Sequence, residues 1–216
     1  MEKKKIPTSV YAEMTPNPIT MKFVADRLLI SGGLQVEYQN ATEAKGSSPL
    51  AQELFHFPFV KRVFISSNFV TITRDESLDW DMIVMQLREY IREWLMDHDI
   101  AVTAVPAHLL VRENATVPDS VSANTPASTQ LSTPQLPPSE YDEAIIHLLN
   151  EYVRPAVEQD GGAIDFVGYD NKVVYVNMRG ACSGCPSSTA TLKGGIENLL
   201  KAKLPDVVEE VMAQSV

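Results

Sequence analysis

The residues best suited to chemistry in this 216-residue chain are its only two cysteines, Cys182 and Cys185. They lie in the run RGACSGCPSST, residues 179–189, between a predicted strand and a predicted helix. Thiolate sulfur binds zinc and iron-sulfur clusters, and such centres normally take four protein ligands. A chain with two thiols therefore supplies half of a coordination site, and a second copy of the chain is the simplest source of the other half.

Several kinds of site use a Cys-x-x-Cys pair, and the residues alone leave them open. A dithiol-disulfide redox site is one, because thioredoxin-like enzymes place such a pair at a helix start, although the rest of that fold is not evident here. A zinc site would need a second pair or a Cys/His pair, and His147 is the only histidine in residues 140–216. A cluster shared by two subunits requires only that two copies associate. A pair without chemical function is the remaining alternative.

The predicted position of the pair favours reactive thiols. Cys182 falls in the turn from strand to helix, and Cys185 falls at the helix start, next to Pro186. Free N–H groups and the positive end of the helix dipole stabilise thiolate over thiol at such a place. Gly180 and Gly184 permit backbone conformations closed to other residues and leave room near the main chain.

The elements around the cysteines are predicted from hydrophobic periodicity and turn residues. Their order is helix, strand, strand, helix, strand. They are a helix from Ser139 to near Pro155, strands over residues 163–169 and 172–178 around the turn Asp170-Asn171, a helix from Pro186, and a strand over residues 207–212. The run Asp160-Gly-Gly162 is read as a tight turn before the first of these strands.

The first half of the chain predicts a second, cysteine-free unit. Its strand patterns cover residues 21–30, 34–38, 60–65 and 69–73, and its helical patterns cover residues 48–56 and 77–98. The longer helix carries apolar residues at three- and four-residue spacings, the stripe of an amphipathic helix. Both halves are therefore α+β.

A compositional change separates the two halves. Residues 113–139 contain five prolines, no glycine and no aromatic residue, and they carry almost no charge. Such a segment cannot bury enough apolar surface to offset its ordering entropy. We predict two small α+β domains, residues 1–112 and 140–216, joined by a flexible, disordered Pro/Ser/Thr linker over residues 113–139.

Composition excludes some partners and compartments. The formal net charge of −10 argues against nucleic acid, and no apolar stretch approaches the roughly 20 residues that span a bilayer. Residues 1–26 lack arginine and an apolar core and include Glu2, Glu13 and Asp26, which argues against a secretion signal or a transit peptide. We therefore predict a cytoplasmic protein, in which a Cys-x-x-Cys pair is a metal or redox site rather than a structural disulfide.

The chain resembles a known family at several of these motifs. DGG at residues 160–162, NMRG at 177–180 and CSGCPSSTATLKGGI at 182–196 are similar to the C-terminal domain of the NifU-like (Nfu) iron-sulfur proteins, over about residues 141–212. The first half of the chain is similar to the N-terminal domain found in many Nfu proteins. The similar motifs are TPNPITMKF at residues 15–23, SPL at 48–50, LF at 54–55 and VFISSNFVTI at 63–72. The long proline-rich linker departs from the common arrangement and leaves the placement of the domains open.

The resemblance implies a scaffold or carrier rather than an enzyme. Such a protein holds a [4Fe-4S] cluster between two subunits, with Cys182 and Cys185 from each, and passes it to apo-proteins. Its implied partners are a second copy of itself, upstream cluster donors and apo iron-sulfur clients. Ligand count alone also permits a [2Fe-2S] cluster, and a Cys-x-x-Cys thiol-disulfide oxidoreductase is the alternative function. The first domain is then a candidate docking module for clients, with the linker raising the local concentration of the cluster.

Overall fold

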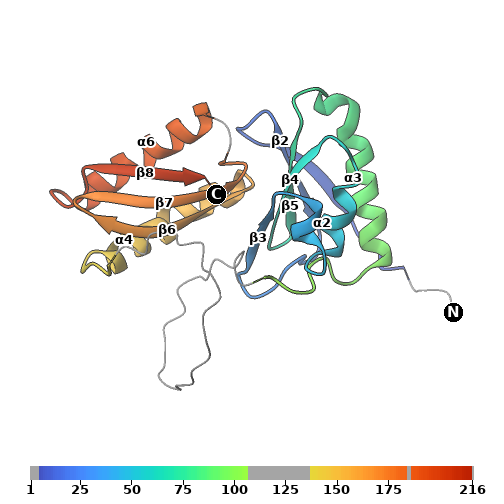
Figure 1. Ribbon diagram of the computed structural model, residues 1–216, viewed down its shortest axis with the longest axis horizontal. Coiled ribbons are helices and arrows are strands. Elements are labelled where there is room, and N and C mark those ends of the chain that lie inside the picture. Colours follow the sequence, from blue (N-terminus) through green and yellow to red (C-terminus); the bar gives the residue numbers. More distant parts are fainter. Residues whose placement is uncertain (1–4, 107–136, 184–185, 216) are drawn as a thin grey trace, which may run out of the picture.

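A computed structural model describes residues 5–106, 137–183 and 186–215 of the chain. Two sheet-containing units are present, so the predicted α+β class is confirmed (Figure 1). We call residues 5–106 the N-terminal unit and residues 137–215 the C-terminal unit. Most of the predicted linker lies in residues 107–136, outside the described residues. The domain boundaries 1–112, 113–139 and 140–216 therefore stay predictions.

The N-terminal unit is built on a five-stranded sheet of order β1-β2-β5-β4-β3, in which all neighbouring strands are antiparallel. Its strands are β1 (Val10–Met14), β2 (Thr20–Ala25), β3 (Gln35–Tyr38), β4 (Val60–Ser66) and β5 (Phe69–Arg74). The predicted hairpin of β4 and β5 is confirmed, and it turns at Ser67 with a positive φ of 46°. The edge strand β1 was not predicted, because only its first residue is buried and its alternation is weak.

One face of this sheet carries the main hydrophobic core. The helices α2 (Pro49–Leu54) and α3 (Trp80–Asp97) pack on it, and the short helix α1 (Ala41–Ala44) lies beside them. Side chains that alternate along the strands point to this face and meet the apolar stripe of α3. The core includes Phe23, Val36, Val63, Val70, Ile72, Leu87, Ile91 and Leu95. The two predicted helices of this unit are confirmed.

Ser48 ties α2 to the end of the N-terminal unit. Its hydroxyl accepts a hydrogen bond from the Ala51 amide at 3.1 Å and donates one to the Ala101 carbonyl at 2.7 Å. We expect Ser48→Ala to lower the free energy of unfolding by about 1–2 kcal/mol, because it removes a helix cap and leaves a buried carbonyl without its partner. Urea unfolding measures this, and Ser31→Ala at an exposed loop position should change stability by less than about 0.5 kcal/mol. Equal effects of the two substitutions would contradict this role of Ser48.

The C-terminal unit has a three-stranded sheet of order β6-β7-β8. β6 (Gly162–Asp170) and β7 (Val173–Gly180) form the predicted antiparallel hairpin around Asn171, which has a positive φ of 48°. β8 (Glu210–Ser215) pairs parallel with β7 after the crossover helix α6 (Pro186–Lys203). The helices cover one face of this sheet, and their shared core contains Ile145, Val157, Ile164, Val176, Met178, Ile196 and Leu200.

Two predicted boundaries in this unit are wrong. The first helix continues past Pro155, as α4 (Asp142–Leu148), a π-helical turn η1 (Leu149–Val153) and α5 (Arg154–Gln159). Pro155 is tolerated because the helix is π-helical just before it, with the Arg154 amide bonded to the Leu149 carbonyl, and an irregular turn of this kind accommodates a residue without an N–H. The last strand begins at Glu210 rather than 207, because the Val207 amide bonds the Leu204 carbonyl in the preceding turn.

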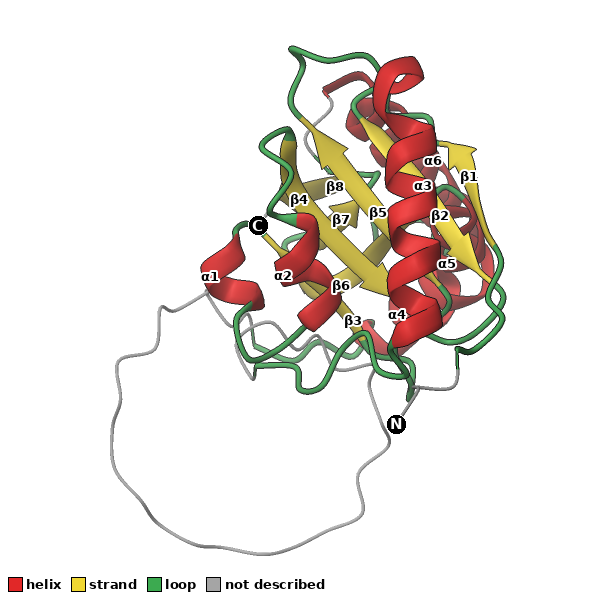
Figure 2. Ribbon diagram, turned by 90° about the vertical axis from the view of Figure 1, so that its right-hand side faces the viewer, coloured by secondary structure: helices red, strands yellow, loops and turns green. Residues whose placement is uncertain are grey.

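The C-terminal unit lies on the second face of the N-terminal sheet. Figure 2 shows α3 in front of this sheet and the strands of the C-terminal unit behind it. Lys22, Thr71, Phe64 and Glu37 are successive cross-strand partners on that second face. All four side chains are buried, although three of them are polar. The N-terminal sheet is thus covered on both faces, by its own helices on one and by the C-terminal unit on the other.

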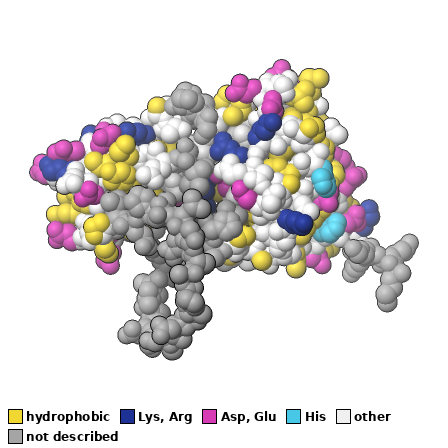
Figure 3. Space-filling view, viewed as in Figure 1, with side chains coloured by type: hydrophobic (Ala, Val, Ile, Leu, Met, Phe, Trp, Pro, Cys, Tyr) yellow, Lys and Arg dark blue, Asp and Glu magenta, His cyan; other side chains and the backbone are white. Residues whose placement is uncertain are grey.

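Charges of both signs are mixed on the visible surface. On the face seen in Figure 3, Lys and Arg side chains are interspersed with Asp and Glu side chains over both units. Among the described residues, no helix is both long enough and apolar enough to cross a membrane.

Candidate functional site

The cysteine loop, defined here as residues 180–183, follows directly on β7. Gly180 ends the strand with a positive φ of 64°, so the prediction that it takes a special backbone conformation is confirmed. Cys182 is only 7% exposed, and it packs against the core of the C-terminal unit. Cys185, the other predicted ligand, and Gly184 lie outside the described residues, and α6 follows from Pro186.

The turn between α5 and β6 holds Cys182 in place. A Cβ atom at Gly162 would lie 2.5 Å from the Cys182 Sγ and 2.8 Å from the Arg179 carbonyl oxygen, so only glycine fits there. Sequence reasoning identified the run Asp160-Gly-Gly162 as a turn but did not bring it next to the cysteine. Its two adjacent glycines were the available signal, because tandem glycine at a strand start indicates a close approach of backbone.

The environment of Cys182 favours the thiol over the thiolate. Burial, and secondarily the negative charge of Asp160, raises the pKa of Cys182 to about 12. The prediction of a stabilised thiolate is therefore wrong for Cys182 in this arrangement. The physical reason is position: the thiol is buried, and α6 begins only at Pro186, four residues further along. A metal centre needs the thiolate, so Cys182 must gain either a cation or a different environment to serve as a ligand.

A cavity of about 590 Å³ lies beside Cys182. Its walls come from η1, the end of α5, the cysteine loop and α6, and Pro16 of the N-terminal unit also lines it. The lining residues are mostly apolar or small: Pro16, Tyr152, Val153, Ala156, Asp160, Ala181, Cys182, Thr191, Leu192, Gly195, Ile196 and Leu199. There is therefore room next to the thiol on the side of the two helices.

Side chains of the N-terminal unit form hydrogen bonds to the cysteine loop on both sides of Cys182. The Asn17 side-chain amide donates hydrogen bonds to the carbonyl oxygens of Ala181 at 3.2 Å and Ser183 at 3.1 Å. Arg62 donates to the Ser183 hydroxyl oxygen at 2.8 Å. Asn17 is fully buried and Ser183 is 1% exposed, so the two Asn17 bonds are buried, whereas the Arg62 bond is partly buried.

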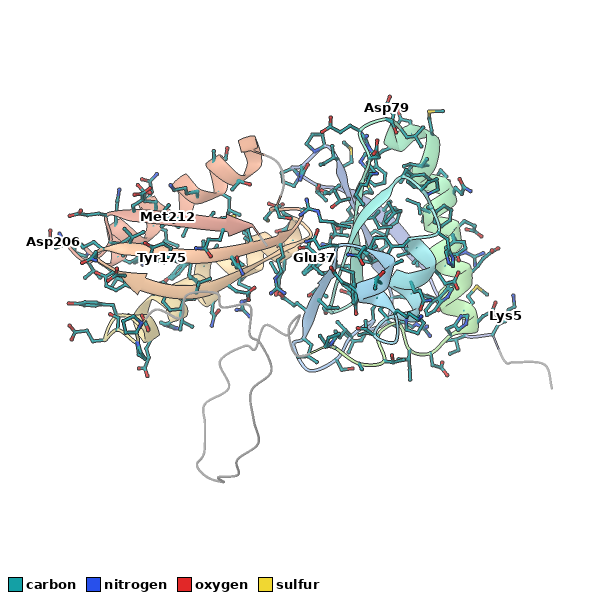
Figure 4. The ribbon with its side chains drawn as sticks, in the orientation of Figure 1. Lys5, Glu37, Asp79, Tyr175, Asp206 and Met212 are labelled. Atoms are coloured by element: carbon teal, nitrogen blue, oxygen red, sulfur yellow. The ribbon has the colours of Figure 1, made fainter. Side chains whose placement is uncertain are left out.

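Glu37 adds a charged contact at the start of the loop. Glu37 lies where the two units meet (Figure 4). Its carboxylate accepts a hydrogen bond from the Gly180 amide at 3.1 Å. Burial raises the pKa of Glu37, while Arg62, the bond from Gly180 and Arg179 act in the opposite direction. Arg179 is itself paired with Asp165 inside the C-terminal unit. The two units therefore meet through a buried group of charged and polar side chains, which sequence reasoning did not find because its members come from distant strands.

The donor set around Cys182 is incomplete within the part of the chain that the structure describes. In those residues, no three Cys, His, Asp or Glu side chains are grouped to hold a metal ion. His147 lies on α4 beside Glu151, with 3.4 Å between the ring Nε2 and the carboxylate. A metal centre at Cys182 would therefore need further donors, from Cys185 or from another molecule.

Comparison with known proteins assigns both units. Residues 145–211 match the model of the NifU-like domain, and residues 10–98 match the model described as scaffold protein Nfu/NifU N terminal. The chain thus carries a NifU-like domain and an Nfu/NifU N-terminal domain. The resemblance predicted from the motifs is thereby confirmed for both halves of the chain.

Two curated relatives agree with this assignment. The protein named NFU1 iron-sulfur cluster scaffold homolog, mitochondrial, of Drosophila persimilis is 33% identical over 207 residues, which cover 94% of this chain and 64% of that protein. The protein of the same name from Drosophila erecta is 33% identical over 211 residues, or 95% of this chain and 66% of that protein. The solution structure of a NifU-like protein from Saccharomyces cerevisiae covers 48% of this chain and 89% of its own, with 23% identity and a TM-score of 0.41. The chain thus spans just under two thirds of these Drosophila relatives.

The predicted cytoplasmic location is wrong. The Drosophila relatives are all named as mitochondrial proteins, and this contradicts it. The prediction rested on the absence of arginine and the presence of acidic residues in residues 1–26. Most of that segment belongs to the folded unit, because β1 and β2 occupy Val10–Met14 and Thr20–Ala25. Its composition reflects the sheet and carries no information about targeting.

Proposed function

We propose that the protein is an iron-sulfur cluster scaffold or carrier rather than an enzyme. In this function it binds a [4Fe-4S] cluster between two copies of the chain, through Cys182 and Cys185 of each, and transfers the cluster to apo-proteins. The observation that carries the proposal is the position of Cys182, at the end of β7 and in the wall of a 590 Å³ cavity, within a NifU-like domain. The relatives that carry both units are named iron-sulfur cluster scaffolds.

Ligand number supports a shared site. The chain has two thiols, whereas a [4Fe-4S] cluster takes four thiolates. Two copies supply that number without any further residue. A [2Fe-2S] cluster takes the same number of thiolates and is the alternative cargo. A cluster held at a subunit junction is released when the junction opens, which suits a carrier better than a permanent cofactor site.

The remaining partners follow from this function. A carrier receives its cluster from an upstream donor and gives it to apo iron-sulfur proteins, so both classes must reach the cysteine loop. The redox alternative, a thiol-disulfide oxidoreductase, needs an attacking thiolate near neutral pH. Burial raises the pKa of Cys182 to about 12, and this acts against both functions, because a cluster ligand is also a thiolate. The match to the NifU-like domain and the names of the relatives favour the scaffold over the oxidoreductase.

Anaerobic reconstitution with iron and sulfide tests the function. We expect about four iron and four sulfide per two chains, since four thiolates hold one [4Fe-4S] cluster. Light scattering should give the mass of a dimer for the loaded protein and a smaller mass for the cluster-free protein. Protein that stays colourless and monomeric, but turns over a disulfide substrate without metal, would instead establish the oxidoreductase.

A further inference from the structure

The second face of the N-terminal sheet carries polar residues of the kind found on solvent-exposed sheet faces. Antiparallel sheets with one packed and one solvated face alternate apolar and polar residues along each strand. β2, β3 and β5 follow this pattern, with Lys22, Glu37 and Thr71 on the second face. These side chains are nevertheless 8%, 6% and 1% exposed, because the C-terminal unit covers them. The face thus carries these polar side chains beside the apolar Val24, Phe64 and Phe69, and all of them are buried in the structure.

The contacts on this face are mostly hydrogen bonds to backbone. Thr71 donates to the Gly161 carbonyl at 2.7 Å, and Lys22 donates to the Gln159 carbonyl at 3.0 Å. One small apolar cluster joins the units, made of Val24, Phe64 and Phe69 from the N-terminal sheet and Ala163 from β6. Water can replace hydrogen bonds of this kind when the units separate, so their net contribution is small. An interface with this chemistry can open and close, unlike a hydrophobic core.

Several of the hydrogen bonds between the units are made to the cysteine loop itself. Asn17 bonds the carbonyls on both sides of Cys182, Arg62 holds Ser183, and Glu37 holds the amide of Gly180. Glycine permits this approach, since a Cβ at Gly180 would lie 2.8 Å from a ring carbon of Phe64. The result is that Cys182 is 7% exposed. A second copy of the chain cannot bring its own thiols to Cys182 while Pro16 and Asn17 occupy this position.

We propose that the polar face of the N-terminal sheet, with Asn17, is a reversible docking surface for the chain's own cysteine loop. Docking shields Cys182 in the cluster-free protein, and undocking exposes it to a second copy of the chain and to the cluster. The undocking step rests on the proposed scaffold function, whereas the shielding does not.

Alkylation of the reduced, cluster-free full chain by iodoacetamide tests the shielding. Fragmentation of the peptide over residues 180–193 separates modification of Cys182 from modification of Cys185. Asn17→Asp keeps the side-chain oxygen that accepts from the Ile19 amide at 3.2 Å, but it places a carboxylate against the carbonyls of Ala181 and Ser183. Arg62→Gln removes the charged donor to Ser183. We expect Arg62→Gln to raise the alkylation rate of Cys182 about tenfold, the factor that corresponds to the loss of one such bond, and Asn17→Asp, which removes two, to raise it at least as much.

Lys61→Gln is the matched control, because Lys61 precedes Arg62 on β4 but pairs at 2.9 Å with Asp75 inside its own unit. It should leave the rate unchanged, and Arg62→Lys should restore part of the shielding. Thermal unfolding of each variant shows whether both units remain folded. Equal Cys182 rates in the wild type, Asn17→Asp and Arg62→Gln would overturn the proposal.

The undocking step has a separate readout. Small-angle scattering should give a larger radius of gyration for Asn17→Asp than for the wild type, and reconstitution with iron and sulfide should proceed about tenfold faster in this variant. Loading at the wild-type rate would overturn the undocking step. A chain that takes up no cluster in any form would refute the proposed function and leave the alkylation result standing. The two failures are therefore distinguishable.

Discussion

Full-length protein with Cys182→Ser or Cys185→Ser is expected to retain no cluster after anaerobic reconstitution. Each substitution exchanges one sulfur for oxygen, and it leaves two copies of the chain with two thiolates where four are required. A serine hydroxyl does not ionise near neutral pH and is a poor ligand for iron in a cluster. Iron and sulfide content should fall from about four each per two chains to near zero.

The fold provides the control for this result. Serine is slightly smaller than cysteine, and Cys182 contributes only a small side chain to the core of the C-terminal unit. The melting temperature and the circular dichroism of both variants should therefore stay close to those of the wild type. A single variant that still binds a full cluster would show that the substituted cysteine is not a ligand. If a variant loses the cluster and also unfolds, Cys→Ala substitutions at the same positions would test whether each cysteine is a ligand.

The local elements were largely predictable from the sequence. Turn residues predicted the hairpin of β6 and β7, and apolar residues at three- and four-residue spacings predicted α3 and α6. The errors have local physical causes. β1 is an edge strand with a weak alternation, and η1 absorbs the strain that would have ended the helix at Pro155. Patterns based on regular α-helices cannot anticipate a π-helical turn.

The candidate site was predictable in its identity but not in its surroundings. Spacing identified Cys182 and Cys185, because two thiols separated by two residues are informative on their own. Nothing in the spacing connects Asn17 or Arg62 with Ser183, at separations of more than 100 positions. The resulting burial reversed the expected direction of the Cys182 pKa. A cysteine next to a helix start is activated only if it is also accessible.

The polar second face of the N-terminal sheet links this burial to function. Its composition was visible in the sequence as ordinary alternation, which predicts a solvated surface. The structure instead places the C-terminal unit against it. If a stable core had been the only requirement, apolar residues at Lys22, Glu37 and Thr71 would have served better, because buried polar groups add little net stability. Polar residues at these positions are what a surface needs if it is to be exposed for part of the time.

Gly162→Ala is expected to reduce both stability and cluster content. The added Cβ would lie 2.5 Å from the Cys182 Sγ and 2.8 Å from the Arg179 carbonyl oxygen. The sulfur can rotate away, but the backbone oxygen belongs to the β6–β7 ladder and cannot, so the turn and the thiol must both shift. Overpacking of this kind costs about 1–3 kcal/mol. Urea unfolding and iron analysis after reconstitution measure the two effects.

The matched control is the same substitution at Gly194 in α6. A Cβ at Gly194 meets nothing within 4 Å, and alanine is the better helix former by about 0.5–1 kcal/mol. Gly194→Ala should therefore raise the free energy of unfolding and leave the iron content unchanged. Because the chemical change is identical, opposite signs at the two positions can come only from their surroundings. A Gly162→Ala variant with unchanged stability and full iron content would show that Gly162 does not hold Cys182 in position, and the backbone contact would then lose its role in the site.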